Sequence, residues 1–182
     1  MSGQNHVASG VLIVDDNEDL RELNKLRLEP HYAVTTAATG SECVEVLSHD
    51  VDVVFLDRTM PGLTGEETAH KIKNGPYSPA VVMLSANVPD IDILDIPCDG
   101  YIEKPADKSD LITAVERSLA LPTHEPQLRK YHSLKSKVQT LQRVSHRCFE
   151  ASVEFQQAVN ELQSLERHLP QGRARNDTAT ST

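Results

Sequence analysis

The stretch Val11-Leu12-Ile13-Val14-Asp15-Asp16 decides the fold of this chain. Four consecutive apolar residues are typical of a short strand that is buried on both faces, as strands of parallel sheets are. Two carboxylates follow directly, at the point where such a strand ends. The same pattern returns at 51–57, where the run VDVVFL stops at Asp57. The sequence therefore predicts a parallel sheet with acidic residues at its strand ends.

Strand-like and helix-like segments alternate along residues 10–121. Asn17 can cap a helix that carries Leu20, Leu23 and Leu26, and Asp107 can open the last helix. Five such units predict an α/β fold, a doubly wound five-stranded parallel sheet with helices on both faces. In such sheets ligands bind outside the carboxyl ends of the strands. The expected strands are 11–14, 32–38, 51–56, 80–84 and 100–102.

The connection between the fourth and fifth strands departs from this pattern. Pro89, Pro97 and four Asp residues lie between Ser85 and Lys104. Proline cannot occupy a helix interior, and it also restricts the residue before it. We therefore expect a short, partly irregular and mobile segment in place of a regular fourth helix.

The C-terminal third of the chain differs in pattern. After a linker at 122–126, residues 127–169 contain neither Gly nor Pro. Their apolar residues recur at alternating three- and four-residue steps, which predicts a heptad seam on one long helix of roughly 65 Å, or a coiled coil. A second run, Tyr131, Leu134 and Val138, is out of phase with the seam, and we interpret this mismatch as a stammer near Leu141. The seam residues are Leu141, Val144, Cys148, Ala151, Phe155, Ala158, Leu162, Leu165 and Leu169.

Composition narrows the class of protein. Residues 1–121 carry 9 Lys and Arg against 21 Asp and Glu, whereas 122–182 carry 9 against 6. The basic excess of the second part is too diffuse for a nucleic-acid partner. No apolar run is long enough to insert into a membrane, and three unspaced Cys fit a reduced, cytoplasmic protein. The termini, 1–9 and 170–182, are polar, and we expect them to be disordered.

The acidic residues at the strand ends point to a metal site. Asp15 and Asp16 end the first strand and Asp57 ends the third, and neighbouring strands bring these carboxylates together. Three carboxylates in one pocket repel one another, and an all-oxygen site of this kind suits Mg²⁺ or Mn²⁺. Lys104 and Ser85 follow the fifth and fourth strands and would add an ammonium and a hydroxyl at the same edge. Such a pocket can stabilise a phosphoryl group that is transferred to a carboxylate oxygen.

Four motifs, each at a strand end and in this order, resemble the response-regulator receiver domain of two-component signalling, whose fold is flavodoxin-like. The resemblance covers residues 10–121. No motif is decisive alone, but the four together are highly specific. They are Asp15-Asp16, the run DRTMPGLTG from Asp57 to Gly65, Ser85-Ala86, and the run YIEKP from Tyr101 to Pro105.

The resemblance implies a role for each matching residue. Asp57 would be the phospho-acceptor, receiving its phosphoryl group from a phosphohistidine on a histidine kinase or phosphotransfer protein. Asp15, Asp16, Asp57 and the backbone carbonyl of Thr59 would bind Mg²⁺. Ser85 and Lys104 would contact the phosphoryl oxygens, and Tyr101 would be a switch aromatic. The protein would be a regulator and not an enzyme in its own right.

Other functions remain open at this point. A haloacid-dehalogenase-like phosphatase also uses an Asp nucleophile and Mg²⁺. Such enzymes have an Asp-x-Asp motif at the nucleophile, whereas this chain has Asp57-Arg58-Thr59, without the second carboxylate. A scaffold with a vestigial receiver would keep the residues without binding metal. His146 faintly resembles the phosphorylated histidine of sensor kinases, although a solvated histidine fits better. For the receiver, output would run through 127–169, by self-association as a dimer or by binding partner helices.

Overall fold

The computed structural model of the chain describes residues 9–120, 125–144, 149 and 152–169. The chain forms two compact units. Unit 1 consists of Met1–Val88 and Ile96–Ala120, and unit 2 consists of Pro89–Asp95 and Leu121–Thr182. None of the helices within the described residues has the length and apolar character that crossing a membrane requires.

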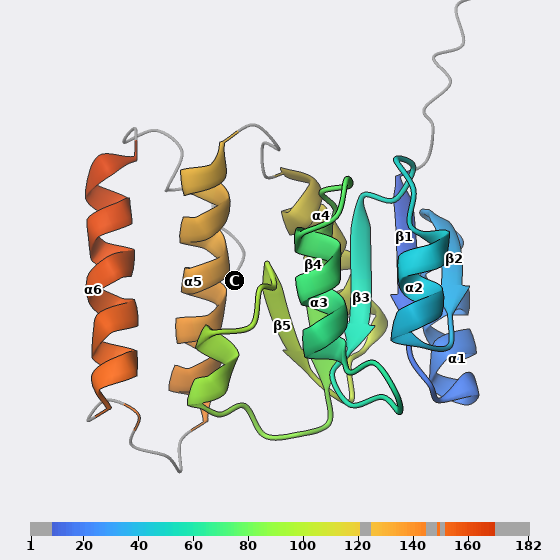
Figure 1. The fold of residues 1–182 in the computed structure, drawn as a ribbon, viewed down its shortest axis with the longest axis horizontal. Helices are drawn as coiled ribbons and strands as arrows, with labels where there is room; N and C mark the ends of the chain where they lie inside the picture. The colour runs from blue at the N-terminus through green and yellow to red at the C-terminus, as the bar shows by residue number, and fades with distance from the viewer. Residues whose placement is uncertain (1–8, 121–124, 145–148, 150–151, 170–182) are drawn as a thin grey trace, which may run out of the picture. The chain divides into compact units, whose positions relative to one another are not determined.

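Unit 1 is built around a five-stranded parallel sheet in the order β2-β1-β3-β4-β5 (Figure 1). The predicted fold class, an α/β doubly wound sheet of the flavodoxin-like kind, is confirmed. The predicted strands lie within one or two residues of those observed. In chain order the elements are β1 (Gly10–Val14), α1 (Glu18–Leu28), β2 (Ala33–Ala37), α2 (Gly40–Val46), β3 (Val53–Asp57), α3 (Gly65–Lys73), β4 (Ala80–Ser85), β5 (Gly100–Glu103) and α4 (Lys108–Ala120).

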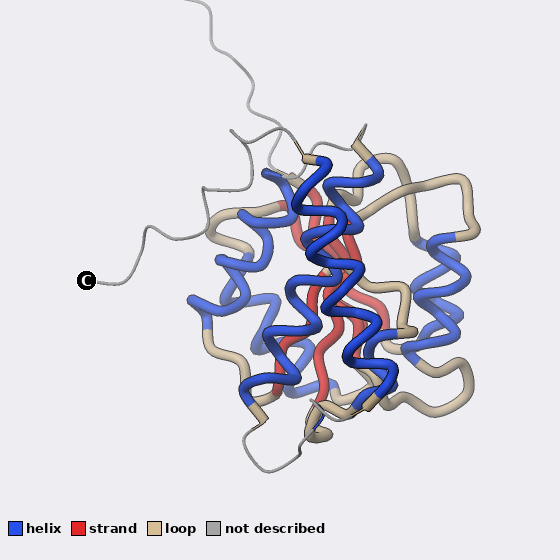
Figure 2. The backbone as a smooth tube through the Cα atoms, turned by 90° about the vertical axis from the view of Figure 1, so that its left-hand side faces the viewer, coloured by secondary structure: helices blue, strands red, loops and turns tan. Residues whose placement is uncertain are grey.

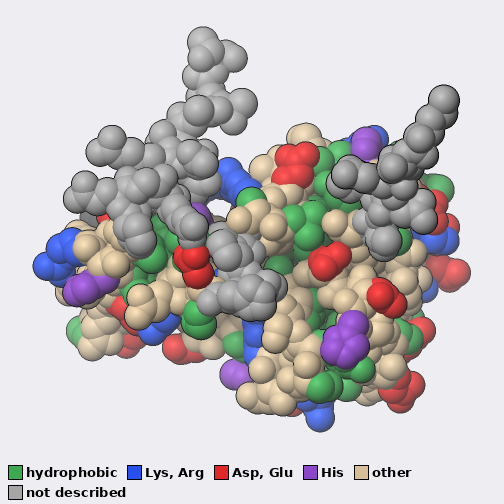
Figure 3. All heavy atoms as spheres, turned by 90° about the horizontal axis from the view of Figure 1, so that it is seen from above, with side chains coloured by type: hydrophobic (Ala, Val, Ile, Leu, Met, Phe, Trp, Pro, Cys, Tyr) green, Lys and Arg blue, Asp and Glu red, His purple; other side chains and the backbone are tan. Residues whose placement is uncertain are grey.

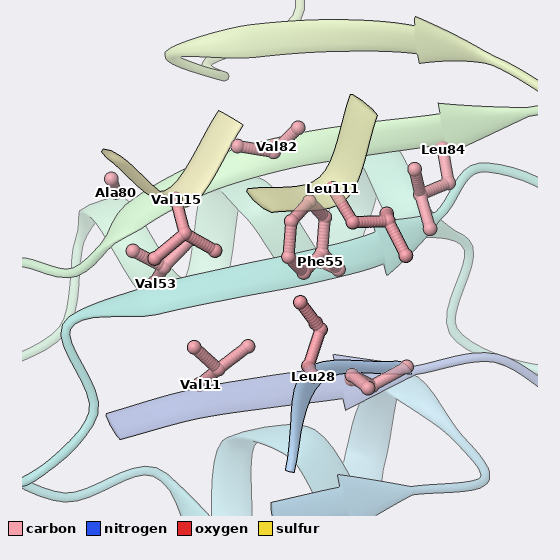
Figure 4. Packing of buried hydrophobic residues seen from close by; sticks show 10 residues of the cluster. Val11, Leu28, Val53, Phe55, Ala80, Val82, Leu84, Leu111 and Val115 are labelled. Atoms are coloured by element: carbon pink, nitrogen blue, oxygen red, sulfur yellow. The ribbon is translucent and has the colours of Figure 1, made fainter. Parts of the chain in front are cut away.

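Helices of unit 1 cover both faces of the sheet (Figure 2). Helix α1 packs beside α4, and α2 packs beside α3. The main core lies between the strands and the α1–α4 pair, where Phe55 of β3 is fully buried and Leu28 of α1 and Leu111 of α4 point toward it (Figure 4). This core is almost wholly aliphatic, as the low aromatic content requires. It fixes the strands from which the polar residues at the carboxyl edge project.

Side-chain caps begin three helices of unit 1, and the cap of α1 is Asn17, as the sequence predicts. The side chains of Asn17 and Thr39 accept hydrogen bonds from the backbone N–H groups of Leu20 and Glu42. Helix α3 has a complete capping box between Thr64 and Glu67. These caps satisfy N–H groups that have no partner within the helix, and so they fix where each helix starts.

The connection between β4 and β5 contains a single short 3₁₀ helix, η1 (Ile91–Leu94), and no regular α-helix. The side chain of Asp90 caps η1 by accepting from the Ile91 N–H at 2.7 Å. The predicted absence of a regular fourth helix in this segment is confirmed. Residues 89–95 belong to unit 2, although the strands on either side of them belong to unit 1.

Unit 2 corrects the expectation of one long helix over 127–169. The chain forms two helices, α5 (Pro126–Arg143) and α6 (Val153–His168), and they pack against each other as an antiparallel hairpin (Figures 1 and 2). The first turns of α5 meet the last turns of α6 in an apolar cluster. Its members are Leu128, Tyr131, Leu162, Leu165 and Leu169.

The break in apolar phase near Leu141 separates two helices and is not a stammer within one helix. Helix α5 ends just after Leu141, at Arg143, and Ser152 caps α6 by accepting from the Phe155 N–H at 3.0 Å. Folding back lets the two apolar stripes bury each other within one chain, which a single extended helix could not do alone. Parts of five predictions lie outside the described residues, namely the N-terminus, the linker, His146, the seam residues Cys148 and Ala151, and the tail from 170 onward.

Candidate functional site

Three carboxylates meet at the carboxyl edge of the sheet. Strand register sets their level, because Val14 of β1 pairs with Leu56 of β3, and Asp15 and Asp57 come next in the chain. One carboxylate oxygen from each of Asp15, Asp16 and Asp57 lies within 4.8 Å of the others. Asp15 and Asp57 are buried, whereas Asp16 is exposed. The structure thus brings together the three residues that the sequence placed at one edge.

Figure 3 looks onto the opposite edge, at the amino ends of the strands. In the part of that edge which the grey atoms leave visible, Asp and Glu side chains are scattered among apolar and neutral ones (Figure 3). They do not form a group there comparable with the three carboxylates at the carboxyl edge.

Lys104 joins two of the carboxylates. It follows β5, and its Nζ donates to Asp57 Oδ1 at 2.6 Å and to Asp15 Oδ2 at 2.8 Å. Its backbone N–H donates to the Ser85 carbonyl at 2.7 Å, which holds the end of β5 against β4. Burial alone would lower the pKa of Lys104, but the hydrogen bonds and charges of Asp15 and Asp57 outweigh it and raise the pKa. The ammonium is therefore fully charged at neutral pH.

Asp57 occupies an unfavourable position for a charged group. Burial raises its pKa above the ordinary value of 3.8, and the charges of Asp15 and Asp16 raise it further. The hydrogen bond and charge of Lys104 lower the pKa but compensate only in part. One ammonium faces three carboxylates, so the cluster keeps an excess of negative charge. A divalent cation bound by these oxygens would remove that excess, and oxygen-only ligands are those that Mg²⁺ prefers.

Ser85 lies at the end of β4, next to the cluster in the sheet. It is 1% exposed, and its hydroxyl oxygen accepts from the backbone N–H of Asn87 at 3.1 Å. The side-chain amide of Asn87 in turn donates to Thr59 Oγ1 at 3.5 Å. Sequence reasoning missed Asn87, although its position two residues after a strand-end serine was a usable signal. Thr59 and Asn87 connect the loops that follow β3 and β4.

Tyr101 of β5 is buried, at 6% exposed. Its hydroxyl has no hydrogen-bond partner among the described residues. A buried phenol oxygen without a partner is unfavourable, because it has lost its water. The structure therefore places Tyr101 on the strand beside Ser85 without joining the two by a hydrogen bond.

The loop after Asp57 packs closely against the backbone of the site. A Cβ built on Gly65 would lie 2.2 Å from the Asp57 carbonyl oxygen, so only glycine fits at the start of α3. The Gly65 N–H donates to the Arg58 carbonyl at 3.1 Å, and Arg58 Nη2 pairs with Glu66 at 2.7 Å. Sequence reasoning gave no role to Gly65 or Arg58. Their contacts position the loop that carries the Thr59 carbonyl.

Residues 11–116 match the family model of the response regulator receiver domain. The chain is 39% identical over 127 residues to a candidate transcriptional regulator of Haloferax volcanii, and covers 22% of that protein. It is 29% identical over 126 residues to the response regulator SaeR of Staphylococcus aureus, and covers 53% of it. The match spans 69% and 67% of this chain, respectively. The chain thus corresponds to about a fifth and a half of the lengths of these relatives.

Solved structures give the same match. A CheY-like receiver domain of Methanospirillum hungatei superposes with a TM-score of 0.55 and 27% identity, covering 62% of this chain and 94% of that one. A receiver domain of Clostridium thermocellum gives a TM-score of 0.55 and 26% identity, covering 61% and 94%. The shared part in both cases is about as long as unit 1.

Proposed function

The chain belongs to the response-regulator receiver family, and from this premise we propose that Asp57 accepts a phosphoryl group from a phosphohistidine with the help of Mg²⁺. The donor is a cognate histidine kinase or a phosphotransfer protein. The observation that carries the proposal is the geometry at the strand ends. Asp57 lies within 4.8 Å of two further carboxylates and 2.6 Å from the ammonium of Lys104.

Asp15, Asp16 and Asp57, with the backbone carbonyl of Thr59, are the groups that would hold Mg²⁺ or Mn²⁺. The donor set fits, because each side chain offers a hard oxygen and the cluster has an excess of negative charge. When bound, the cation offsets the charge of the incoming phosphoryl oxygens. Asp16 is the exposed member, so the site opens to solvent on its side.

The reaction is a transfer between two nucleophiles. A carboxylate oxygen of Asp57 forms a bond to phosphorus, the bond from phosphorus to the donor's imidazole nitrogen breaks, and its electron pair returns to the ring. Lys104 then pairs with a phosphoryl oxygen in addition to Asp15. The Ser85 hydroxyl, which now donates to the Asn87 carbonyl at 3.5 Å, donates instead to another phosphoryl oxygen. Tyr101 changes its packing when Ser85 moves. The protein is a regulator that undergoes this transfer and the later hydrolysis of the aspartyl phosphate, in which water takes the phosphoryl group as inorganic phosphate and the Asp57 carboxylate is restored. It does not turn over a separate substrate.

The test is chemical labelling of the full chain. Acetyl phosphate with Mg²⁺ should add one phosphoryl group by intact mass, and peptide mapping should place it on Asp57. Asp57→Asn and chelation of the metal should each abolish the label. Asp50→Asn, which changes an exposed carboxylate outside the cluster, should label normally. An unlabelled wild-type chain that also fails to bind Mg²⁺ would favour the scaffold with a vestigial receiver.

Output through the C-terminal segment is part of the same proposal. The helices within 127–169 would act by self-association or by binding partner helices, and no nucleic-acid partner is needed for this. Cys43 and Cys98 are buried, and we place the protein in the cytoplasm, as the absence of regular Cys spacing in the sequence favours. Light scattering of the full chain and of a chain ending at Ala120 tests the output. Equal association of the two would exclude the C-terminal segment as the assembling part.

A further inference from the structure

The connection between β4 and β5 is built into the helical hairpin. The chain leaves unit 1 after Val88, contributes residues 89–95 to unit 2, and returns to unit 1 at Ile96. Within unit 2, η1 packs against both α5 and α6. The hairpin therefore consists of three segments, and one of them is an internal loop that begins four residues after Ser85.

Residues 89–95 are held in the hairpin by apolar and polar contacts. Ile93 of η1 is fully buried. Lys137 of α5 is only 6% exposed, and its Nζ donates to the Leu94 carbonyl at 3.2 Å. An ammonium that has lost its water requires such acceptors, so the packing of Lys137 depends on η1 staying in place.

Charge favours the same arrangement. Helix α5 contains five Lys or Arg residues and no Asp or Glu. Residues 89–95 contain three Asp and no basic residue. Opposite charge on the two segments adds long-range attraction to the contacts made by Ile93 and Lys137.

The link between this loop and the proposed phosphorylation site is short and stiff. Only residues 86–88 separate Ser85 from Pro89. Within the link, the Asn87 N–H is bonded to the Ser85 hydroxyl oxygen, and its side chain is bonded to Thr59. Pro89 has a fixed φ and restricts Val88 before it, and Pro97 restricts Ile96 in the same way. Three residues are too few to absorb a displacement of Ser85, so the displacement should reach residue 89.

We propose that residues 89–95 are a tether through which the state of Asp57 controls the packing of α5 and α6. With the tether seated in the hairpin, the Ser85 hydroxyl accepts from the Asn87 N–H and donates to the Asn87 carbonyl at 3.5 Å, so its proton is directed away from a phosphoryl group. When Ser85 turns to donate to that group, residues 86–88 move and draw the tether from its seat, which loosens the hairpin. This inference rests on the proposed function, since it names the regulation of that same site. By linkage, unseating the tether must also favour the phosphorylated arrangement.

The first experiment uses the full chain with beryllofluoride and Mg²⁺. Fluorine NMR reports whether beryllofluoride binds at Asp57, and hydrogen exchange reports on peptides from α5 and α6. We expect binding to lower the protection of both helices. Asp57→Asn should show neither the bound fluorine signal nor the change in exchange.

The second experiment reverses the direction of the coupling. Lys137→Gln and Ile93→Ala weaken the seat of the tether and should raise the apparent affinity for beryllofluoride by about fivefold or more. Lys130→Gln is the matched control. It makes the same change of charge on the same helix, but removes only an exposed pair with Glu161 (2.5 Å) and should leave the affinity unchanged. If Ile93→Ala unfolds the hairpin, Lys137→Gln alone decides the outcome, because it keeps the length of the side chain.

The outcomes separate the two proposals. Absence of a bound fluorine signal in the wild-type chain overturns the proposed function. A bound signal with unchanged or increased protection of α5 and α6 overturns the tether alone. An affinity for beryllofluoride that is the same in Lys137→Gln as in Lys130→Gln also overturns the tether.

Discussion

Burial makes the charged form of Asp57 unfavourable in the metal-free protein. Its pKa is raised by burial first and then by Asp15 and Asp16. Because the pKa of Asp57 is higher in the folded than in the unfolded chain, the group does not destabilise the protein below pH 3.8, its value in the unfolded chain. The protein loses stability as the pH rises from there through the folded pKa. Asp57→Asn should therefore raise the melting temperature at pH 7, and the gain should disappear below pH 3.8.

Thermal unfolding in a metal chelator, measured at both pH values, checks this expectation. Asp50→Asn, at an exposed position outside the cluster, is the control and should leave the melting temperature unchanged. Added Mg²⁺ should reverse the order, because it stabilises only a chain that retains the Asp57 carboxylate. A destabilised Asp57→Asn variant at pH 7 without metal would contradict the strained cluster.

Gly65 is a second residue at which a substitution should disturb the site, because no side chain fits there. A methyl group at this position meets the Asp57 carbonyl at 2.2 Å, and backbone cannot move aside as a flexible side chain does. Gly65→Ala should cost about 1–3 kcal/mol of stability and slow the labelling of Asp57. Urea unfolding and acetyl phosphate labelling measure the two effects.

Gly100→Ala is the comparison for this variant, because a Cβ on Gly100 comes no closer than 3.6 Å to Val82. It should be tolerated without loss of labelling. Equal behaviour of the two alanine variants would show that the loop after Asp57 is looser than its contacts suggest.

Among the secondary-structure elements, α3 depends most visibly on its first turn. Thr64 and Glu67 form a reciprocal capping box, and hydrogen bonds from Thr64 lower the pKa of Glu67 below 4.5. A lowered pKa contributes stability above pH 4.5 that is lost as the pH falls through the folded value. Thr64→Ala should cost about 1 kcal/mol at pH 7. The cost should shrink in acid, and urea unfolding at pH 7 and below pH 4 would show it. If the loss of stability in Thr64→Ala did not change with pH, the Thr64 cap would not depend on the charge of Glu67.

The elements also show what sequence patterns could predict. Strand ends were predictable because buried apolar runs stop at charged residues such as Asp57, and parallel strands bring those ends together. The buried face of α1 was less predictable. Leu20, Leu23 and Leu26 are exposed, whereas Leu28 and the polar Asn24 are buried. Three leucines on one helix do not reveal which face the sheet will cover, because that depends on how α4 packs beside it.

The hairpin could not be predicted from periodicity alone. A heptad pattern is satisfied equally by a partner chain and by a second helix of the same chain, and periodicity does not distinguish between the two. The roles of Asn87 and Gly65 could not be predicted from sequence patterns for a similar reason. Their roles come from contacts with Thr59 and with the Asp57 backbone, which are distant in sequence and close only after folding.

For the whole molecule, the crossing of the chain between units has a direct test. A recognition sequence for a specific protease, inserted between Ala120 and Glu125, allows the covalent connection to α5 to be cut. Because residues 89–95 remain part of the hairpin, the two fragments should stay associated during gel filtration. Replacing the buried Ile93 by Asp should let them separate after the same cut. Fragments that part without this substitution would mean that the loop does not hold the hairpin.

The interlaced path of the backbone also limits how such a protein can be recombined. A hairpin attached only at the end of a receiver can be exchanged by joining two genes at one point. Here the graft would need two pieces, the C-terminal helices and the seven residues 89–95 that complete them. Residues 89–95 and the C-terminal helices must therefore be exchanged together. A chimera that receives the helices without the matching loop should have an unfilled groove between them.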